Sequence, residues 1–576
     1  MQDEMYDQLL NILSSVQYPE QGQSAAQKAA ALYHNCLKVR DGGADDSTAL
    51  RQFIKSVGLA VPLRPEVDAL DKVLLLFFKY NLLTLLGLSL EDSQLDRGVR
   101  EIKVALNIDQ LSWFHQRDSE LLMGFYPSHL DALGLVKHRE EALRIAIEIA
   151  ASENTAISLL TKETLEEATR MIFSTVGDIG IHTPSVRPDH WATLISKHSD
   201  NIYQKNHKVQ ISISALAYFD KVHSNLGEAG TSLLTAWELM RTLVPLSSPH
   251  LAKRVRYFQL LCLRSAVRAM EVPLLSHYLF KAVPESTVAS AETMSEGMRR
   301  SVTEEILHAD WLDNATRSAA LDKMRTLRAH IGYPKFFGND GELDEVFARY
   351  PEVSGHFLTP WLSAMKLTIE WEMKNQSSFK FSLRTTNAAY FPMRNKLILP
   401  ATILRPPVFV PGAPRAYNYG GLGSVIGHEM THAFDGQGSM WDGSGKWRDW
   451  WSKSSRRLYN DKLTCLRSSH GSTRDVADSE NMADFAGVVS AHAAYAGLRA
   501  KEEQVTVAGL QQSAQRLFFV STCLKWCATL GNVSVANYAP WRDRCVIPLK
   551  NIEAFKDAFG CHRNSSMMQP SRCSFW

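Results

Sequence analysis

Apolar residues recur every three or four positions along most of the first 300 residues of the chain. Between residues 136 and 168 this spacing places Ala142, Ile145 and Ile149 on one side of a helix. Residues 143–149 also alternate as a strand would, but the length of the unbroken stretch and its alanine and glutamate content favour a helix. We therefore expect residues 1–300 to be mostly helical.

The run of residues 73–86 is apolar enough to suggest a membrane-spanning segment. Lys79 and Asn81 interrupt it, and the uninterrupted part is much shorter than the ~20 residues that cross a bilayer. We interpret the run as buried core and expect no membrane span in this chain. A basic stretch followed by an apolar one, which is typical of a signal peptide, is not visible in the first few residues either.

The pattern changes near residue 310. An amphipathic helix is predicted at residues 310–327, with its end at residues 330–334, and another helix at residues 361–371. Beyond them, β-branched and aromatic residues between turn signals predict strands at residues 379–391 and 396–400. We expect the edge strand of a substrate cleft here, because an extended peptide can add to such an edge through backbone hydrogen bonds.

The composition is that of a large globular protein. Hydrophobic residues make up 45% of the 576 positions, which is enough to fill the cores of two or more domains. The formal net charge is only +2, and no basic run or repeat of basic and aromatic residues is present. We therefore expect no nucleic-acid partner.

Residues 427–432 read Gly-His-Glu-Met-Thr-His and contain the pattern H-E-x-x-H. On a helix, His428 and His432 would share one face and could bind the same metal ion, while Glu429 would lie beside it as a general base. This pattern indicates a hydrolytic zinc site. The alternative is a chance match on an amphipathic surface helix, where the histidines are solvated or hydrogen-bonded to neighbours.

A catalytic zinc ion usually has three protein ligands, and Glu480 is the candidate for the third. Glu480 and Asp484 would share a helix face, so Asp484 could hydrogen-bond the outer nitrogen of a ligand histidine. Asp435 could do the same for the other histidine. An ordinary solvated acidic face fits the spacing of Glu480 and Asp484 equally well.

Several motifs, in a fixed order, resemble the neprilysin and endothelin-converting-enzyme family of zinc metallopeptidases. The similarity is dense from about residue 310 to the end and thinner, but traceable, back to residues 30–36. The matching stretches are residues 387–392, 400–407, 418–435, 450–451, 480–484, 526–527 and 573–576. Such a series is far more specific than one pentapeptide.

The resemblance implies a mainly α (α+β) protein with two lobes. Residues 301–576 would form a thermolysin-like catalytic lobe with the H-E-x-x-H helix and a small β-sheet edge. Residues 1–300 would form a mostly helical lobe, with inter-lobe linkers, that covers the active site and limits access to small peptides. One Zn²⁺ ion, an extracellular location and cleavage of short peptides on the amino side of apolar residues are also implied.

The resemblance also assigns substrate contacts. The Asn387 side chain and the Ala388 backbone would hold the peptide beside the zinc, although a turn-forming residue at a strand end is an equal interpretation of Asn387. Arg544 would bind the substrate's backbone or carboxylate. By motif position, the candidates for the lining of the side-chain pocket are Ile403, Val425 and Trp526.

Tyr538 occupies the position where the family has a histidine that donates a hydrogen bond to the developing oxyanion. A neutral phenol still donates, but it lacks the positive charge of an imidazolium, and loss of one oxyanion donor can cost ~10²–10³ in turnover. We therefore expect an active enzyme of reduced or altered efficiency. The alternative is that Tyr538 is only a packed aromatic residue.

Eight cysteines and four N-x-S/T sequons fit an oxidising, glycosylating compartment. The resemblance pairs Cys36 with Cys262 and Cys465 with Cys573.

The resemblance does not give the pairing of the other four cysteines. In the family, the cysteines equivalent to Cys527 and Cys561 bond an N-terminal segment that we expect this chain to lack. Cys523 and Cys545 lie outside the family pattern. We expect them to bond to each other as a compensating bridge.

Two functions of different classes remain open. The first is a zinc endopeptidase acting on short extracellular peptides, and the second is a catalytically weakened peptide-binding or scavenging protein that retains zinc. The presence of Glu429 favours the first, because a protein without turnover has no evident need of a general base. The departure from the family at Tyr538 and the expected lack of the N-terminal segment favour the second.

Overall fold

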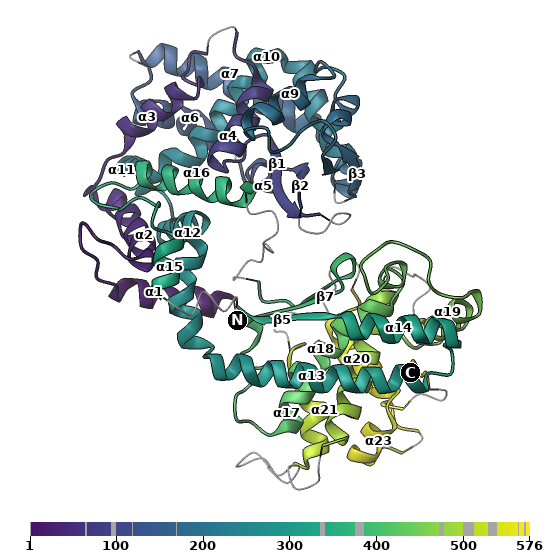
Figure 1. Cartoon of the computed structure of the whole chain (residues 1–576). Coiled ribbons are helices and arrows are strands. Elements are labelled where there is room, and N and C mark those ends of the chain that lie inside the picture. Colours follow the sequence, from purple (N-terminus) through teal and green to yellow (C-terminus); the bar gives the residue numbers. More distant parts are fainter. Residues whose placement is uncertain are drawn as a thin grey trace. The chain divides into compact units, whose positions relative to one another are not determined.

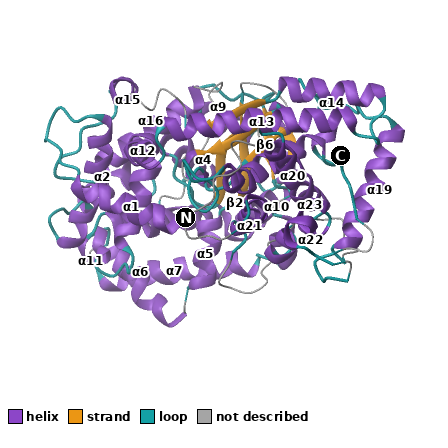
Figure 2. Cartoon of the chain, turned by 90° about the horizontal axis from the view of Figure 1, so that it is seen from below, coloured by secondary structure: helices purple, strands orange, loops and turns teal. Residues whose placement is uncertain are grey.

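The fold is mainly helical, as the sequence predicted, and the described residues form two small β-sheets, of which only the one in the C-terminal half was expected (Figures 1 and 2). The computed structural model describes residues 2–63, 66–93, 99–117, 119–136, 138–168, 170–333, 340–374, 385–471, 477–498, 512–527, 538–562, 564–568 and 572–576.

The chain divides into two compact units. Unit 1 comprises residues 1–5, 279–335 and 382–576, and unit 2 comprises residues 6–278 and 336–381. The division therefore falls before the predicted boundary between residues 300 and 301. A later segment, residues 336–381, also belongs to the unit that contains most of the N-terminal half.

Unit 2 contains a four-stranded sheet of order β1-β2-β4-β3. Strand β1 (Leu86–Asp92) pairs antiparallel with β2 (Arg100–Leu106), and β2 pairs parallel with β4 (Lys208–Ile211). Strand β3 (Ile172–Thr175) pairs antiparallel with β4 at the other edge. The sequence did not predict this sheet, because its strands are short and lie among long helical patterns.

The remaining elements of unit 2 are helical. Two helices cross its division from unit 1: α1 (Gln2–Ser15) and α12 (Phe258–Ala282). The others are α2 (Ala25–Asp41), α3 (Ser47–Ser56), α4 (Ala69–Tyr80), α5 (Ile108–Gln116), α6 (Ser119–Leu133), α7 (Arg139–Ser158), α8 (Lys162–Glu167), η1 (Val176–His182), α9 (His190–His198), α10 (Ile213–Leu243), η2 (Val244–Leu246), α11 (Pro249–Ala252), α15 (Asp340–Val346) and α16 (Leu358–Lys374).

The helical interpretation of residues 136–168 is confirmed, with one break. Helix α7 ends at Ser158, and the Thr161 side chain then caps α8 by accepting a hydrogen bond from the Thr164 backbone N–H. The apolar run at residues 73–86 lies mostly in α4, which is buried in the core. Among the described residues, no helix combines the length and apolar character needed to cross a membrane.

Unit 1 contains a three-stranded sheet of order β5-β7-β6. The central strand β7 (Lys396–Pro400) was predicted, and it pairs parallel with β5 (Arg328–Gly332) and antiparallel with β6 (Ala389–Phe391). Strand β6 is the predicted edge strand, shorter than expected; residues 379–384 of that prediction lie outside the described residues.

The other elements of unit 1 are helices and turns. They are α13 (Glu285–His308), α14 (Asn314–Thr326), η4 (Pro392–Arg394), η5 (Ala401–Ile403), α17 (Arg415–Asn418), the π-helical turn η6 (Tyr419–Gly423), α18 (Ser424–Thr431), η7 (His432–Phe434), η8 (Gly438–Met440), α19 (Lys453–Ser469), α20 (Asp478–Ala496), α21 (Ala514–Leu524), α22 (Trp541–Lys550) and α23 (Glu553–Phe559).

Helix α14 corresponds to the helix predicted at residues 310–327. It begins later than predicted because the Asp313 side chain caps it, accepting a hydrogen bond from the Thr316 backbone N–H. The stretch predicted as the end of this helix instead forms β5, since it pairs with β7. That pairing joins segments far apart in the sequence, which a local pattern does not reveal.

The three predicted cysteine pairs are confirmed as disulfide bonds. Cys527 and Cys561 are free cysteines among the described residues. The bonds are Cys36–Cys262, Cys465–Cys573 and Cys523–Cys545. The third bond links the end of α21 to α22, two helices beside the site described next.

Candidate metal centre and substrate cavity

The H-E-x-x-H motif lies on an unbroken helical segment. Elements α17, η6, α18 and η7 follow one another from residue 415 to residue 434. His428 and His432 are one turn apart, and their Nε2 atoms lie 3.1 Å from each other. Ile426 and Met430, on the other side of the helix, are completely buried and anchor it in the core.

Helices α18 and α20 approach closely through two glycines. A Cβ atom at Gly487 would lie 2.5 Å from the His428 backbone nitrogen, and one at Gly427 would lie 2.6 Å from the Gly487 carbonyl oxygen. Any side chain at either position would therefore force the helices apart. The close packing brings Glu480 and Asp484, at the start of α20, next to the histidines.

The Glu480 carboxylate converges on both histidines. Its Oε2 atom lies 3.2 Å from His428 Nε2, and its Oε1 atom lies 3.8 Å from His432 Nε2. The ligand atoms of the three residues all lie within 4.8 Å of one another. Two imidazoles and one carboxylate form a donor set that suits a catalytic Zn²⁺ ion, so these residues fit the metal that the sequence predicted.

The outer nitrogen of each histidine is bound by a carboxylate. His428 Nδ1 lies 3.0 Å from Asp484 Oδ1, and His432 Nδ1 lies 2.7 Å from Asp435 Oδ2. The Asp435 carboxylate also accepts hydrogen bonds from the backbone N–H groups of Gln437 and Gly438. Both histidines are thereby oriented with Nε2 toward Glu480, as expected for metal ligands.

Charges in the site shift several pKa values. Burial would lower the pKa of His428, but hydrogen bonds with Asp484 and Glu480 raise it to about 10. The pKa of Asp484 is lowered: burial opposes this shift, and the charge of Arg544 and the bond to His428 outweigh it. A site with this excess of carboxylates favours a positive charge between the histidines, whether a proton or a metal ion.

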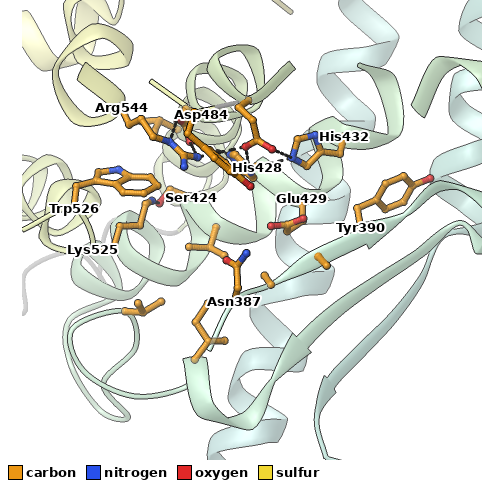
Figure 3. Close-up of a pocket in the computed structure, with 18 of the residues that line it drawn as sticks. Asn387, Tyr390, Ser424, His428, Glu429, His432, Asp484, Lys525, Trp526 and Arg544 are labelled. Atoms are coloured by element: carbon orange, nitrogen blue, oxygen red, sulfur yellow. Dashed lines mark hydrogen bonds and ion pairs between the residues drawn. The ribbon is translucent and has the colours of Figure 1, made fainter. Parts of the chain in front are cut away.

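Glu429 is buried and lines the same cavity as the histidines, as Figure 3 shows. Burial raises the pKa of its carboxyl group, and the neighbouring charges of His428 and His432 partly oppose that shift. A raised pKa brings a carboxylate closer to the range in which it exchanges protons near neutral pH. Glu429 is therefore suited in position and proton affinity to act as a base.

The cavity has a volume of about 840 Å³ and lies within unit 1. The start of the edge strand and the segment before it form one wall, which includes Asn387 and Ala388. The Asn387 side chain points toward the cavity (Figure 3). The structure therefore brings both predicted substrate-contact residues to the cavity that the candidate metal ligands line.

Arg544, on α22, reaches this cavity but is already held by carboxylates. Its Nε and Nη2 atoms donate to Asp484 at 2.6 and 2.9 Å, and Nη2 also lies 3.5 Å from Glu480. Its guanidinium carbon lies 4.1 Å from the ring centroid of Trp526. Its Nη1 atom has no hydrogen bond with a described residue, so it is the group still able to bind a substrate.

Tyr538 lines the cavity beside Glu480 and Arg544. The guanidinium carbon of Arg544 lies 4.6 Å from its ring centroid. Burial raises the pKa of the Tyr538 hydroxyl, with a further contribution from the Glu480 charge. The phenol thus stays protonated and able to donate near neutral pH, although its packing against Arg544 also agrees with the alternative of a packed aromatic residue.

The predicted pocket residues Ile403, Val425 and Trp526 all line the cavity. Two further lining residues, Ser424 and Lys525, were not among the predicted site residues. One signal could have identified Lys525, which is a charged residue directly after the apolar end of α21 and directly before the family motif at residues 526–527.

Comparisons with known proteins agree with this geometry. Models described as Peptidase family M13 match residues 1–334 and 387–575. Membrane metallo-endopeptidase-like 1 of Mus musculus is 29% identical over 335 residues, and Neprilysin-11 of Caenorhabditis elegans is 31% identical over 320 residues. Those alignments cover 53% and 51% of this chain, but only 44% and 37% of the two relatives.

Other comparisons extend over nearly the whole chain. Endothelin-converting enzyme-like 1 of Homo sapiens is 24% identical, with 96% of this chain and 78% of that protein covered. The open state of Mycobacterium tuberculosis zinc metalloprotease Zmp1 superposes with a TM-score of 0.73 at 18% identity, covering 100% of this chain and 94% of that one. The structural likeness shows a shared fold.

Proposed function

Since the chain belongs to peptidase family M13, we propose that it is a zinc-dependent endopeptidase that hydrolyses short peptides. The observation that carries this proposal is the convergence of His428, His432 and Glu480 in a cavity that Glu429 also lines. A fortuitous surface H-E-x-x-H sequence would not be expected to have a third ligand and a carboxylate behind each histidine.

His428, His432 and Glu480 would hold the zinc ion. When bound, zinc supplies Lewis-acid chemistry, polarising the scissile carbonyl and lowering the pKa of water. Glu429 accepts the proton of the attacking water and passes it to the leaving amine. The raised pKa of its carboxyl group favours both transfers, because a group with a pKa nearer neutrality both takes up and releases a proton readily.

Tyr538 and Arg544 act on the substrate carbonyl and backbone in this proposal. The Tyr538 hydroxyl donates to the developing oxyanion, a role supported by its position beside Glu480. Arg544, with Asp484 holding two of its nitrogens, presents Nη1 to a substrate carbonyl or carboxylate. Asp484 and Asp435 orient the two histidines and do not touch the substrate.

The peptide would bind as an additional strand along the β6 edge, with Asn387 and Ala388 holding its backbone. Ile403, Val425 and Trp526 offer the apolar surface that the resemblance assigns to the residue after the cleaved bond. An extracellular site of action is supported by the three disulfide bonds. The restriction to short peptides is inferred only from the resemblance to the family.

A mixed library of short peptides, analysed by mass spectrometry, tests this function. We expect cleavage by the purified protein, loss of cleavage after metal removal, and recovery when zinc is added. The His428→Ala and His432→Ala variants should neither cleave peptides nor retain zinc. The control His308→Ala, at an exposed histidine on α13, should cleave peptides and retain zinc. Cleavage that survives in both ligand variants would contradict the proposal.

A further inference from the structure

Lys525 and Ser424 form a polar pair in the wall of the substrate cavity. Lys525 follows α21, and Ser424 is the first residue of α18. The Lys525 Nζ atom donates a hydrogen bond to Ser424 Oγ at 2.5 Å. Both residues line the cavity, and Figure 3 shows the lysine extended toward the serine.

The serine hydroxyl is oriented to accept this bond. Ser424 Oγ lies 2.6 Å from the Gly420 carbonyl oxygen and 2.9 Å from that of Gly421, so its one proton is directed to the backbone. Its lone pairs therefore face the ammonium group. The contact fixes the Lys525 side chain in the wall without neutralising its charge.

The ammonium group has hydrogen-bonding capacity to spare. It carries three N–H donors, and Ser424 accepts only one of them. Within the described part of the chain, no carboxylate lies within ion-pair distance of Nζ; its other close contact is with the Trp526 ring, 5.5 Å away. The carboxylate of Asp484 also acts on Lys525, but it is bound by Arg544 and His428.

The pair has aliphatic neighbours in the sequence that also line the cavity: Val425 follows Ser424, and Leu524 precedes Lys525. Ile403 and Val408 add further aliphatic lining to the same cavity. A leucine or phenylalanine side chain placed against the ammonium group would exclude water and leave the donors that Ser424 does not accept without a partner, which is unfavourable. A side chain with an apolar stem and a carboxylate at its end would match both the aliphatic surface and the cation.

We propose that this cavity selects a peptide with an acidic side chain, glutamate or aspartate, and that Lys525 is the residue that selects it. The inference rests on the proposed peptidase function, whose substrate class it narrows. It replaces the purely apolar preference that the resemblance implies. The position concerned is expected to be the residue after the cleaved bond, because Lys525 precedes Trp526 and its partner Ser424 precedes Val425, two of the residues proposed to line that pocket.

The expected size of the effect follows from the interaction. A hydrogen bond to a charged partner contributes enough to change an equilibrium constant by about tenfold to a hundredfold. Glutamine has nearly the shape of glutamate but no charge. A peptide with glutamate should therefore bind at least about tenfold more tightly than the same peptide with glutamine.

The test uses matched peptides that carry glutamate, glutamine or leucine at each position around the cleaved bond. Binding is measured to the zinc-loaded Glu429→Gln variant, and cleavage is measured with the parent protein. We expect preference for glutamate at one position in both assays. Lys525→Met, introduced into both proteins, should abolish the difference in binding and cleavage between glutamate and glutamine peptides. Lys525→Arg should keep that difference.

Ser424→Ala tests whether the preference for glutamate comes from the Lys525 ammonium group or from its hydrogen bond to Ser424. This variant loses the hydrogen bond but keeps the ammonium group, so the preference for glutamate over glutamine should persist. Equal binding of glutamate and glutamine peptides by the parent, or a preference that survives Lys525→Met, would overturn the inference. Cleavage without any acidic preference would leave the peptidase function standing, whereas acid-selective binding without cleavage would support the pocket and contradict the peptidase.

Discussion

The Asp484 carboxylate joins the candidate metal ligand His428 to Arg544: its Oδ1 atom lies 3.0 Å from His428 Nδ1, and both of its oxygens accept hydrogen bonds from the arginine. The same side chain therefore orients a group that faces the metal site and a group that faces the substrate. A change at Asp484 should affect metal binding and substrate binding together.

Asp484→Asn should reduce zinc affinity about 10–100-fold, because the amide no longer supplies the charge that fixes and polarises His428. The Michaelis constant for peptides should rise as well, since Arg544 loses its main anionic partner. Competition with a chelating indicator measures the zinc affinity. Asp557→Asn, at an exposed position on α23, is the control and should bind zinc normally. An unchanged zinc affinity in Asp484→Asn would show that this carboxylate does not support the ligand.

Gly487→Ala should weaken both the fold and the metal site. The added methyl group would lie 2.5 Å from the His428 backbone nitrogen and 2.9 Å from the Ser424 carbonyl oxygen, so α18 and α20 must separate. Overpacking of this kind typically costs about 1–3 kcal/mol. Gly497→Ala, at the end of the same helix, places its methyl group no closer than 3.5 Å to its neighbours. In thermal unfolding of the zinc-loaded and the zinc-free protein, the unfolding temperature should fall in Gly487→Ala and stay unchanged in Gly497→Ala.

Tyr538→Phe tests the proposed oxyanion donor. The phenyl ring keeps the packing against Arg544 and removes only the hydroxyl, so turnover should fall by about 10²-fold while zinc content stays the same. Tyr257→Phe, at an exposed tyrosine of unit 2, serves as the control. Turnover equal to that of the parent would assign Tyr538 a packing role only.

The acidic preference should depend on pH. Burial lowers the pKa of Lys525 to about 8; Asp484 opposes this shift and Arg544 adds to it. The ammonium group is charged below that pH and neutral above it, while the pKa of Asp484 is lowered and that of Arg544 is raised, so neither titrates in the same range. The ratio of kcat/KM for glutamate and glutamine peptides should be highest below pH ~7 and fall as the pH rises through about 8.

Lys525→Arg provides the comparison for this profile, because a guanidinium stays charged throughout the range. Its preference for glutamate should persist above the pH at which the parent loses it. A parent ratio that is constant across this range would mean that Lys525 does not titrate in the free enzyme.

Short-range sequence patterns were sufficient to predict the H-E-x-x-H helix, since His428, Glu429 and His432 lie within about one turn of it. They were not sufficient for Glu480 and Asp484, for which an acidic surface face fitted the spacing equally well. Those two side chains meet the histidines only because Gly427 and Gly487 allow two helices to touch. Such a contact depends on tertiary packing between segments distant in the sequence.

The same dependence on tertiary packing explains the elements that the local sequence pattern does not predict. Strand β5 is a strand because it pairs with β7, and the sheet of unit 2 forms among short segments from distant parts of the chain. Ser424 and Lys525 carry no motif of their own. Their relationship becomes visible only when the end of α21 is placed against the start of α18.

Cleavage of a peptide library by the parent protein and by Glu429→Gln, with the zinc content of both determined, is the most direct test of zinc-dependent peptide hydrolysis with Glu429 as the base. We expect one zinc ion in each protein and cleavage by the parent alone, because the variant keeps the ligands and loses the base. Equal cleavage by both proteins would contradict the assigned role of Glu429, and the absence of cleavage by a fully zinc-loaded parent would contradict the peptidase itself.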